Sequence, residues 1–169
     1  MCQLNGSSNR PATTKKQRGF TIIEIAVVML IIAIIGAFAI PQVVNYLKRY
    51  RLTASSRNVA TALQRARYLA TSNNRRAGIN ITDVQHINIE EYDLEDKQPP
   101  QVRGMINLPA GVVLVTDVPK QIAFDGRGLV TPLPTENPKI RVNGESGYYQ
   151  IVTVATTGQV TVSTMNRDE

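Results

Sequence analysis

The first part of the chain is dominated by an almost wholly apolar run, from Phe20 to Ile40, in which Glu24 is the one charged side chain. An apolar helix of about 20 residues can span a bilayer because all of its backbone hydrogen bonds are internal. The run therefore predicts a membrane-spanning helix. Pro41 follows directly, and its ring clashes with the carbonyl group of Ala37, so we expect a kink there.

Beyond Pro41 the apolar positions recur at helical spacing, which predicts that the helix continues to Asn73. The whole helix, from Phe20 to Asn73, should be about 54 residues and roughly 80 Å long. Arginines fill much of its polar face, and such a face is more often solvated or ion-paired than bound to DNA or to lipid headgroups. The expected apolar positions are Val44, Leu47, Leu52, Val59, Leu63, Ala66 and Ala70.

From Ala77 onward the period changes to two, which predicts short strands bounded by Gly, Pro, Asn or Asp. Asn143-Gly144 and Thr157-Gly158 indicate turns, and Glu95–Pro100 indicates a polar loop. A long helix followed by many strands predicts an α+β fold whose antiparallel sheet packs on the apolar face of the helix. The expected strands are residues 77–82, 84–92, 111–117, 121–125, 128–131, 138–144, 147–156 and 159–164.

The net charge of +6 comes largely from the N-terminus. Four of the 19 basic residues precede the apolar run, which leaves 15 basic against 13 acidic residues in the rest of the chain. The positive excess is therefore mainly a topology signal for a cytoplasmic N-terminus. These four residues are Arg10, Lys15, Lys16 and Arg18.

Catalytic and metal chemistry find little support in the sequence. Cys2 is the single cysteine and His86 the single histidine, which disfavours a zinc site or a Ser-His-Asp triad. His86 lies in an alternating stretch and is interpreted as a strand side chain. The sequence holds no glycine-rich phosphate loop or nucleophile elbow, so we expect neither an enzyme nor a bound metal or cofactor.

The junction between the basic leader and the apolar run reads Lys15-Lys16-Gln17-Arg18-Gly19-Phe20-Thr21-Ile22-Ile23-Glu24. It resembles the leader of type IV pilins and pseudopilins: basic residues, Gly, an aromatic residue, and a Glu four positions later. Two plainer interpretations are a simple signal anchor and a cleaved secretory signal peptide. The latter fits poorly, because the apolar run is long and no A-x-A site in a polar setting follows it.

The resemblance implies that a prepilin peptidase cuts between Gly19 and Phe20 on the cytoplasmic side and N-methylates the new Phe20 amine. Residues 1–19, including Cys2, would then be lost. It also implies that Glu24 pairs with the N-terminal amine of a neighbouring subunit, which would offset the cost of a carboxylate in hydrocarbon. The alternative is a Glu24 that reaches the membrane edge of a plain anchor.

The end of the chain carries a second resemblance. Phe124-Asp125-Gly126-Arg127-Gly128, and the later Thr157-Gly158-Gln159-Val160, are similar to turns of the H-type minor pseudopilins (GspH) and the FimT and FimU minor pilins. Phe124, Gly128 and Gly158 are the residues that carry this similarity. A mature chain without cysteine could not form the C-terminal disulfide of many major pilins, which favours a minor subunit.

Together these features predict a pilin-like fold in four segments: a leader (1–19), a transmembrane or filament-core helix (20–41), an amphipathic helix (42–76) and a β-rich periplasmic head (77–169). The resemblance implies a minor pilin or pseudopilin, anchored once in the bacterial inner membrane. It would initiate or cap a filament with other pilin subunits, a prepilin peptidase and an inner-membrane assembly platform. DNA binding during natural transformation, as in some FimT-like proteins, is the less favoured alternative, and a simple anchored periplasmic domain is the third.

Overall fold

The computed structural model describes residues 19–93, 99–115, 120–132 and 134–168. The chain divides into two compact units, one ending at Pro41 and one beginning at Gln42, which are treated one at a time. The basic leader residues and most of the expected loop Glu95–Pro100 lie outside the described residues.

The first unit consists of the N-terminal part of α1, a helix that spans Ile22–Asn73 and continues through Pro41. Its large apolar side chains are uncovered: Ile22 is 90% exposed, and even Val28 is 49% exposed. α1 is long and apolar enough to cross a membrane, and none of its most apolar stretch is buried within the chain. This part of the helix therefore has no hydrophobic core of its own.

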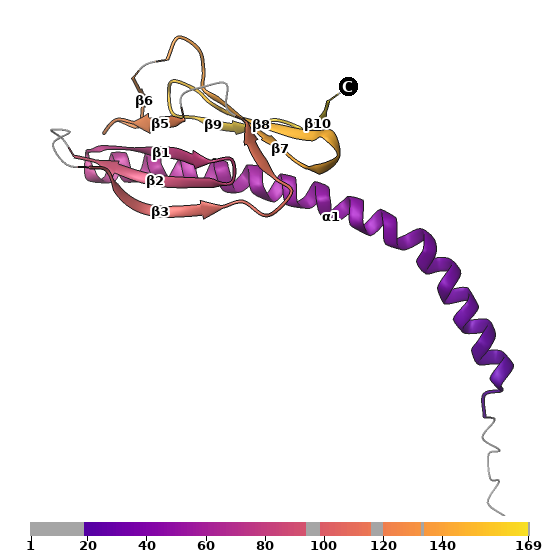
Figure 1. Cartoon of the computed structure of the whole chain (residues 1–169). Coiled ribbons are helices and arrows are strands. Elements are labelled where there is room, and N and C mark those ends of the chain that lie inside the picture. The colour runs from indigo at the N-terminus through magenta and orange to yellow at the C-terminus, as the bar shows by residue number, and fades with distance from the viewer. Residues whose placement is uncertain (1–18, 94–98, 116–119, 133, 169) are drawn as a thin grey trace, which may run out of the picture. The chain divides into compact units, whose positions relative to one another are not determined.

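The second unit contains the rest of α1 and two sheets that share one core with it (Figure 1). The helix ends because Asn74 adopts a left-handed conformation with φ of 47°, and the N–H of Arg75 donates to the carbonyl oxygen of Ala70 at 3.1 Å. This is the Schellman arrangement, which satisfies the last carbonyl groups of a helix. The helical residues buried against the sheets are Leu52, Ser55, Ser56, Val59, Ala60, Ala62, Leu63, Ala66 and Ala70.

Both sheets are antiparallel. The first has the order β3-β2-β1-β5-β6 and the second the order β10-β8-β7-β4, with β9 also paired to β8. The first sheet comprises β1 (Arg76–Asp83), β2 (His86–Tyr92), β3 (Gln101–Asn107), β5 (Gln121–Phe124) and β6 (Val130–Thr131). The second comprises β4 (Val113–Val115), β7 (Lys139–Asn143), β8 (Tyr148–Val154), β9 (Val160–Val162) and β10 (Asn166–Arg167), with the short 3-10 helix η1 (Glu145–Gly147) before β8.

The α+β fold and the packing of the helix on antiparallel strands are confirmed, whereas two strands were missed. β3 is an edge strand with both faces largely exposed, so it lacks the apolar alternation by which strands are recognised. β10 has two residues, too few to show a period.

The predicted packing of the apolar face of the helix on the sheet was wrong for its first two positions. Val44 and Leu47 are 46% and 45% exposed, because the sheets cover α1 only from Leu52 onward. The ten residues after Pro41 are thus helical, contribute no buried side chain to the core of the head and do not belong to the apolar run.

We expect Leu63→Ala to lower the free energy of unfolding by about 2–5 kcal/mol, since it leaves a cavity at a fully buried site between helix and sheets. Leu47→Ala is the matched control, because it removes the same atoms from an exposed site on the same helix. Urea unfolding of the full chain in one detergent, followed by circular dichroism, measures both. Equal losses would contradict the core described above.

Candidate functional site

The bond between Gly19 and Phe20, where the sequence predicts cleavage, precedes the first turn of α1 and lies outside regular secondary structure. Both residues are exposed, and Phe20 retains 79% of its accessible surface. No atom lies within 4 Å of the place that a Cβ of Gly19 would occupy. The structure therefore leaves this peptide bond open to an enzyme.

Thr21 and Glu24 form the N-terminal cap of α1, a role that the sequence analysis missed. The backbone N–H of Glu24 donates to Oγ1 of Thr21 at 3.3 Å, directly before the first helical residue. Thr21 and Glu24 have the S/T-x-x-E spacing of a capping box, so the signal was present in the sequence. A carboxylate in the first turn also interacts favourably with the helix dipole.

The Glu24 carboxylate makes no ion pair with any basic side chain in the part of the chain that the structure describes. The capping box does not require the negative charge, because Gln also occurs at this position, and the helix dipole favours the charge by only about 0.3–1 kcal/mol. The predicted partner in a neighbouring subunit would account for the charge. Pro41 lies inside α1, and the kink expected there stays a prediction.

The two glycine turns of the head have the same local geometry. Gly128 lies between β5 and β6, Gly158 lies between β8 and β9, and both have φ of 81°. The N–H of Gly128 donates to the carbonyl of Asp125, and that of Gly158 to the carbonyl of Ala155, each at 2.8 Å. A positive φ of this size favours glycine, which explains why both turns carry it.

The fold brings the two turns together against Arg67 of α1. The Nε atom of Arg67 donates to the carbonyl oxygen of Gly128 and its Nη2 atom to that of Thr157, both at 3.1 Å. The N–H of Val130 donates to the carbonyl oxygen of Thr156 at 3.1 Å and links the turns directly. This arrangement, which we call the Arg67 clamp, fastens one turn from each sheet to the helix.

Arg67 belongs to the arginine-rich face that was predicted to be solvated or ion-paired. For this residue the prediction was wrong, because Arg67 is half-buried and donates to two backbone carbonyl oxygens. Two contacts to backbone carbonyls that are far apart in sequence leave no periodic signal. Phe124, by contrast, has 0% exposure and ends β5 in the core, as expected of an aromatic residue before a turn.

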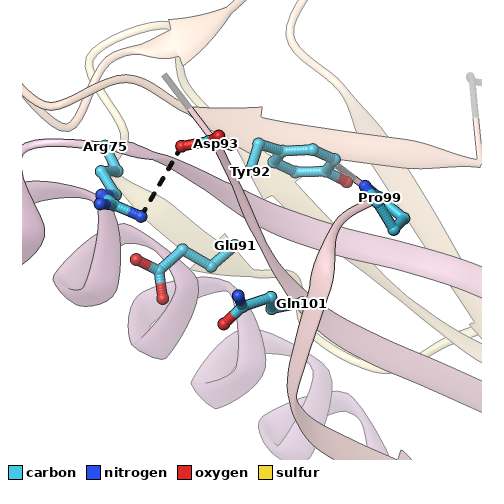
Figure 2. A pocket seen from close by; sticks show the side chains of 6 residues that line it. All are labelled: Arg75, Glu91, Tyr92, Asp93, Pro99 and Gln101. Atoms are coloured by element: carbon cyan, nitrogen blue, oxygen red, sulfur yellow. Dashed lines mark ion pairs between the residues drawn. The ribbon is translucent and has the colours of Figure 1, made fainter. Parts of the chain in front are cut away.

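A polar hollow of about 220 Å³ lies at the far end of the helix, lined by Arg75, Glu91, Tyr92, Asp93, Pro99 and Gln101 (Figure 2). Figure 2 shows the Glu91 carboxylate turned toward α1, where Nδ2 of Asn73 donates to it at 3.1 Å and Nε of Arg103 at 2.7 Å. Arg75 and Asp93 form an ion pair of 3.9 Å across the rim. The acids of this hollow are therefore engaged in structural contacts.

Beside this hollow, the hydroxyl group of Tyr92 donates to the buried Glu90 carboxylate at 2.8 Å and accepts from Gln121. Burial of Tyr92 and its hydrogen bond to Glu90 raise its pKa to about 12. His86 lies at the start of β2 as a half-exposed strand side chain, 3.6 Å from Asp83. No group of three metal-ligating side chains occurs among the described residues.

A second polar hollow, of about 180 Å³, lies at the opposite end of the head. It is lined by Asn45, Lys48, Arg49, Glu145, Tyr148 and Arg167. Nζ of Lys48 lies 2.9 Å from Oε2 of Glu145, and this contact holds the pKa of Glu145 below its usual value. The guanidinium group of Arg49 lies 4.6 Å from the centre of the Tyr148 ring and donates to its hydroxyl at 2.7 Å.

Comparison with known proteins finds matches both to the N-terminal motif and to the fold. Residues 14–40 match the family model of the prokaryotic N-terminal methylation motif. The prepilin peptidase-dependent protein D of Escherichia coli (strain K12) is 58% identical over 38 residues, which are 22% of this chain and 26% of that protein. The chain therefore aligns with about a quarter of the length of this curated relative.

Two solved structures have the fold of the chain. The type IV minor pilin FimU of Pseudomonas aeruginosa (strain PAO1) matches with a TM-score of 0.58 and 14% identity, over 70% of this chain and 92% of FimU. The minor pseudopilin EpsH from the type 2 secretion system of Vibrio cholerae matches with a TM-score of 0.55 and 13% identity, over 67% of this chain and 96% of EpsH. At this identity the likeness concerns the fold.

We expect Gly158→Ala to destabilise the head more than Gly147→Ala does. Both residues have positive φ, which costs alanine about 1–2 kcal/mol. A Cβ at Gly158 would also lie 2.1 Å from the Gly128 carbonyl oxygen, whereas nothing lies within 4 Å of one at Gly147. Overpacking should add about 1–3 kcal/mol at Gly158. Urea unfolding of the full chain measures the difference, and equal values would contradict the close approach of the turns.

Proposed function

We propose that this chain, whose N-terminal motif and fold are those of the type IV pilin and pseudopilin superfamily, is a minor subunit of a filament assembled from the bacterial inner membrane. In that role it is a structural subunit of a type II secretion pseudopilus or a type IV pilus, where it helps to initiate or cap the filament. The observation that carries the proposal is the methylation motif placed at the start of an uncovered apolar helix, which leads into a FimU-like and EpsH-like head.

In this proposal a prepilin peptidase removes residues 1–19 and methylates the amine of Phe20. Support comes from the exposed bond between Gly19 and Phe20, which precedes the helix. Gly19 offers the enzyme no side chain to accommodate. Before assembly, residues 20–41 cross the inner membrane once and the head lies in the periplasm.

Glu24 then has a partner in the filament. A carboxylate taken out of water costs several kcal/mol unless it is paired. The freed amine at Phe20 of a neighbouring subunit is a cation of the right sign at the level of the first helical turn. Because this pair forms at one axial offset between two helices, it sets the register in which the uncovered apolar faces pack. A kink at Pro41 would adapt the helix to that packing.

In this proposal the head folds on its own part of the helix, and the N-terminal part of the helix binds other subunits. The head closes on the helix through its own core and the Arg67 clamp, and it does so without a disulfide in the mature chain. Other pilin subunits cover the N-terminal helix, and an inner-membrane assembly platform extracts the subunit from the bilayer.

The proposal predicts that the mature chain begins at Phe20 with a methylated amine. Co-expression with a prepilin peptidase, followed by mass spectrometry of the N-terminal peptide, measures this. Gly19→Leu should abolish cleavage because its side chain crowds the cleaved bond, whereas Gly6→Leu, the same change within the leader, should leave cleavage intact. A wild-type chain that kept residues 1–19 would sink the proposal and favour a plain anchor.

We expect Glu24→Gln to insert into the membrane normally but to enter filaments at least tenfold less, since an unpaired buried amine costs about 3–5 kcal/mol. Glutamine still suits a capping box, so this change isolates the charge from the cap. Thr21→Val does the reverse: it removes the cap acceptor, keeps the carboxylate, and should leave incorporation intact. Pull-down of tagged neighbouring subunits measures incorporation, and normal incorporation of Glu24→Gln would refute the pairing.

A further inference from the structure

The hollow lined by Asn45, Lys48, Arg49, Glu145, Tyr148 and Arg167 joins residues that are more than 90 positions apart in the chain. It lies between α1, the start of β8 and β10. Its volume of about 180 Å³ is large enough for one phosphate group. None of the residues that line it is used by the proposed processing or by Glu24.

Among the described residues, the charges around the hollow leave two cations without an acidic partner. Lys48 is neutralised by Glu145 at 2.9 Å, and the nearby Asp168 is engaged by Arg141. Arg49 and Arg167 stand over the Tyr148 ring at 4.6 and 5.7 Å, and no carboxylate of a described residue lies within ion-pair distance of either. A guanidinium group has five N–H donors in a planar fork that suits phosphate, and most of these donors remain for a ligand.

The position of the hollow in the chain indicates where that ligand comes from. Asn45, Lys48 and Arg49 follow Pro41 by four to eight residues, so chain connectivity alone keeps them within about 30 Å of the end of the apolar run. Tyr46 and Tyr50, in the same segment, are 68% and 61% exposed. Exposed tyrosines directly beyond an apolar span are typical of the level of lipid headgroups, and long Lys and Arg side chains near the end of a span reach the same level.

We propose that this hollow binds the phosphate of an anionic lipid headgroup while the subunit is anchored in the bilayer, with Arg49 and Arg167 as its ligands. The inference rests on the proposed membrane-anchored function and adds a lipid to its partners. A nucleic acid fits less well, because a polynucleotide needs a row of cations along its backbone. Here the positive charge is interrupted by Glu145, which lines the hollow, and by Asp168, which directly follows Arg167 in the chain.

The bound lipid would connect the two ends of the head. Arg49 belongs to α1 and Arg167 to the last strand, so one phosphate between them ties the C-terminal strand to the helix where the helix leaves the membrane. Extraction into a filament would release the lipid, since the whole chain then leaves the bilayer.

The test uses the purified full chain in a neutral detergent, with phosphatidylglycerol or phosphatidylcholine added, and native mass spectrometry to count retained lipids. We expect preferential retention of phosphatidylglycerol. The double variant Arg49→Ala/Arg167→Ala should weaken that retention roughly 25-fold, at about fivefold per cation. Arg65→Ala/Arg127→Ala is the charge-matched control: both residues are exposed, lie outside the hollow, and should leave retention unchanged.

Equal retention of the two lipids, or equal losses in both double variants, would overturn the proposal. Displacement of phosphatidylglycerol by a short DNA duplex at equal phosphate concentration would overturn it as well and would favour the nucleic-acid alternative. The melting temperature of the wild-type chain, which should be higher with phosphatidylglycerol than with phosphatidylcholine, gives a readout that needs no variant to fold. Neither measurement involves a peptidase or another subunit, so failure here is distinct from failure of the processing and Glu24 tests.

Discussion

The apolar surface of the helix before Pro41 is the constraint on which the rest of the molecule depends. Nothing in the described chain covers it, although side chains such as Ile22 and Phe38 expose about nine tenths and seven tenths of their surface. Burying apolar surface is the main favourable term in folding and association, so this helix requires lipid or other helices around it. In the proposed function one surface would serve in both environments, and the Glu24 carboxylate would distinguish them, since a neighbouring subunit would supply a fixed cation.

The head places a different demand on the same helix. Where the sheets pack, α1 presents alanines and serines between its larger side chains, so strands can approach it closely. The Arg67 clamp adds two hydrogen bonds from the helix to turns of both sheets. The head is thus fixed to its part of the helix by a core and by specific polar contacts. The uncovered part of the helix before Pro41, by contrast, makes no such contacts within the chain. Its surroundings can therefore change while the head keeps its fold.

The parts of the fold that the sequence predicted are those with a periodic or a local signal. Neighbouring residues alone encode the apolar run from Phe20, the helical repeat from Val59 to Ala70 and the glycine turns. The capping box at Thr21 also has a local signal, but it was not recognised although its spacing is visible in the sequence. The edge strand β3 could not be found, because exposure on both faces erases alternation. Arg67 and the hollow between Arg49 and Arg167 also escaped, because they depend on which strands the fold brings beside α1, and no short-range pattern encodes that.

The segment just after Pro41 shows how the two demands meet. A purely apolar segment would lengthen the part of the helix that is stable in lipid. A purely charged segment would be solvated and would have no preferred depth in the membrane. This segment is mixed, since it contains Val43, Tyr46 and Tyr50 together with Lys48 and Arg49. Side chains with an apolar body and a polar end are most stable at the boundary between hydrocarbon and the headgroup region. Such contacts are individually weak, of about 1 kcal/mol for each basic residue near an anionic surface. A small number of weak contacts would hold the proposed subunit at one depth and still allow it to leave, as the proposed exchange of lipid for neighbouring helices requires.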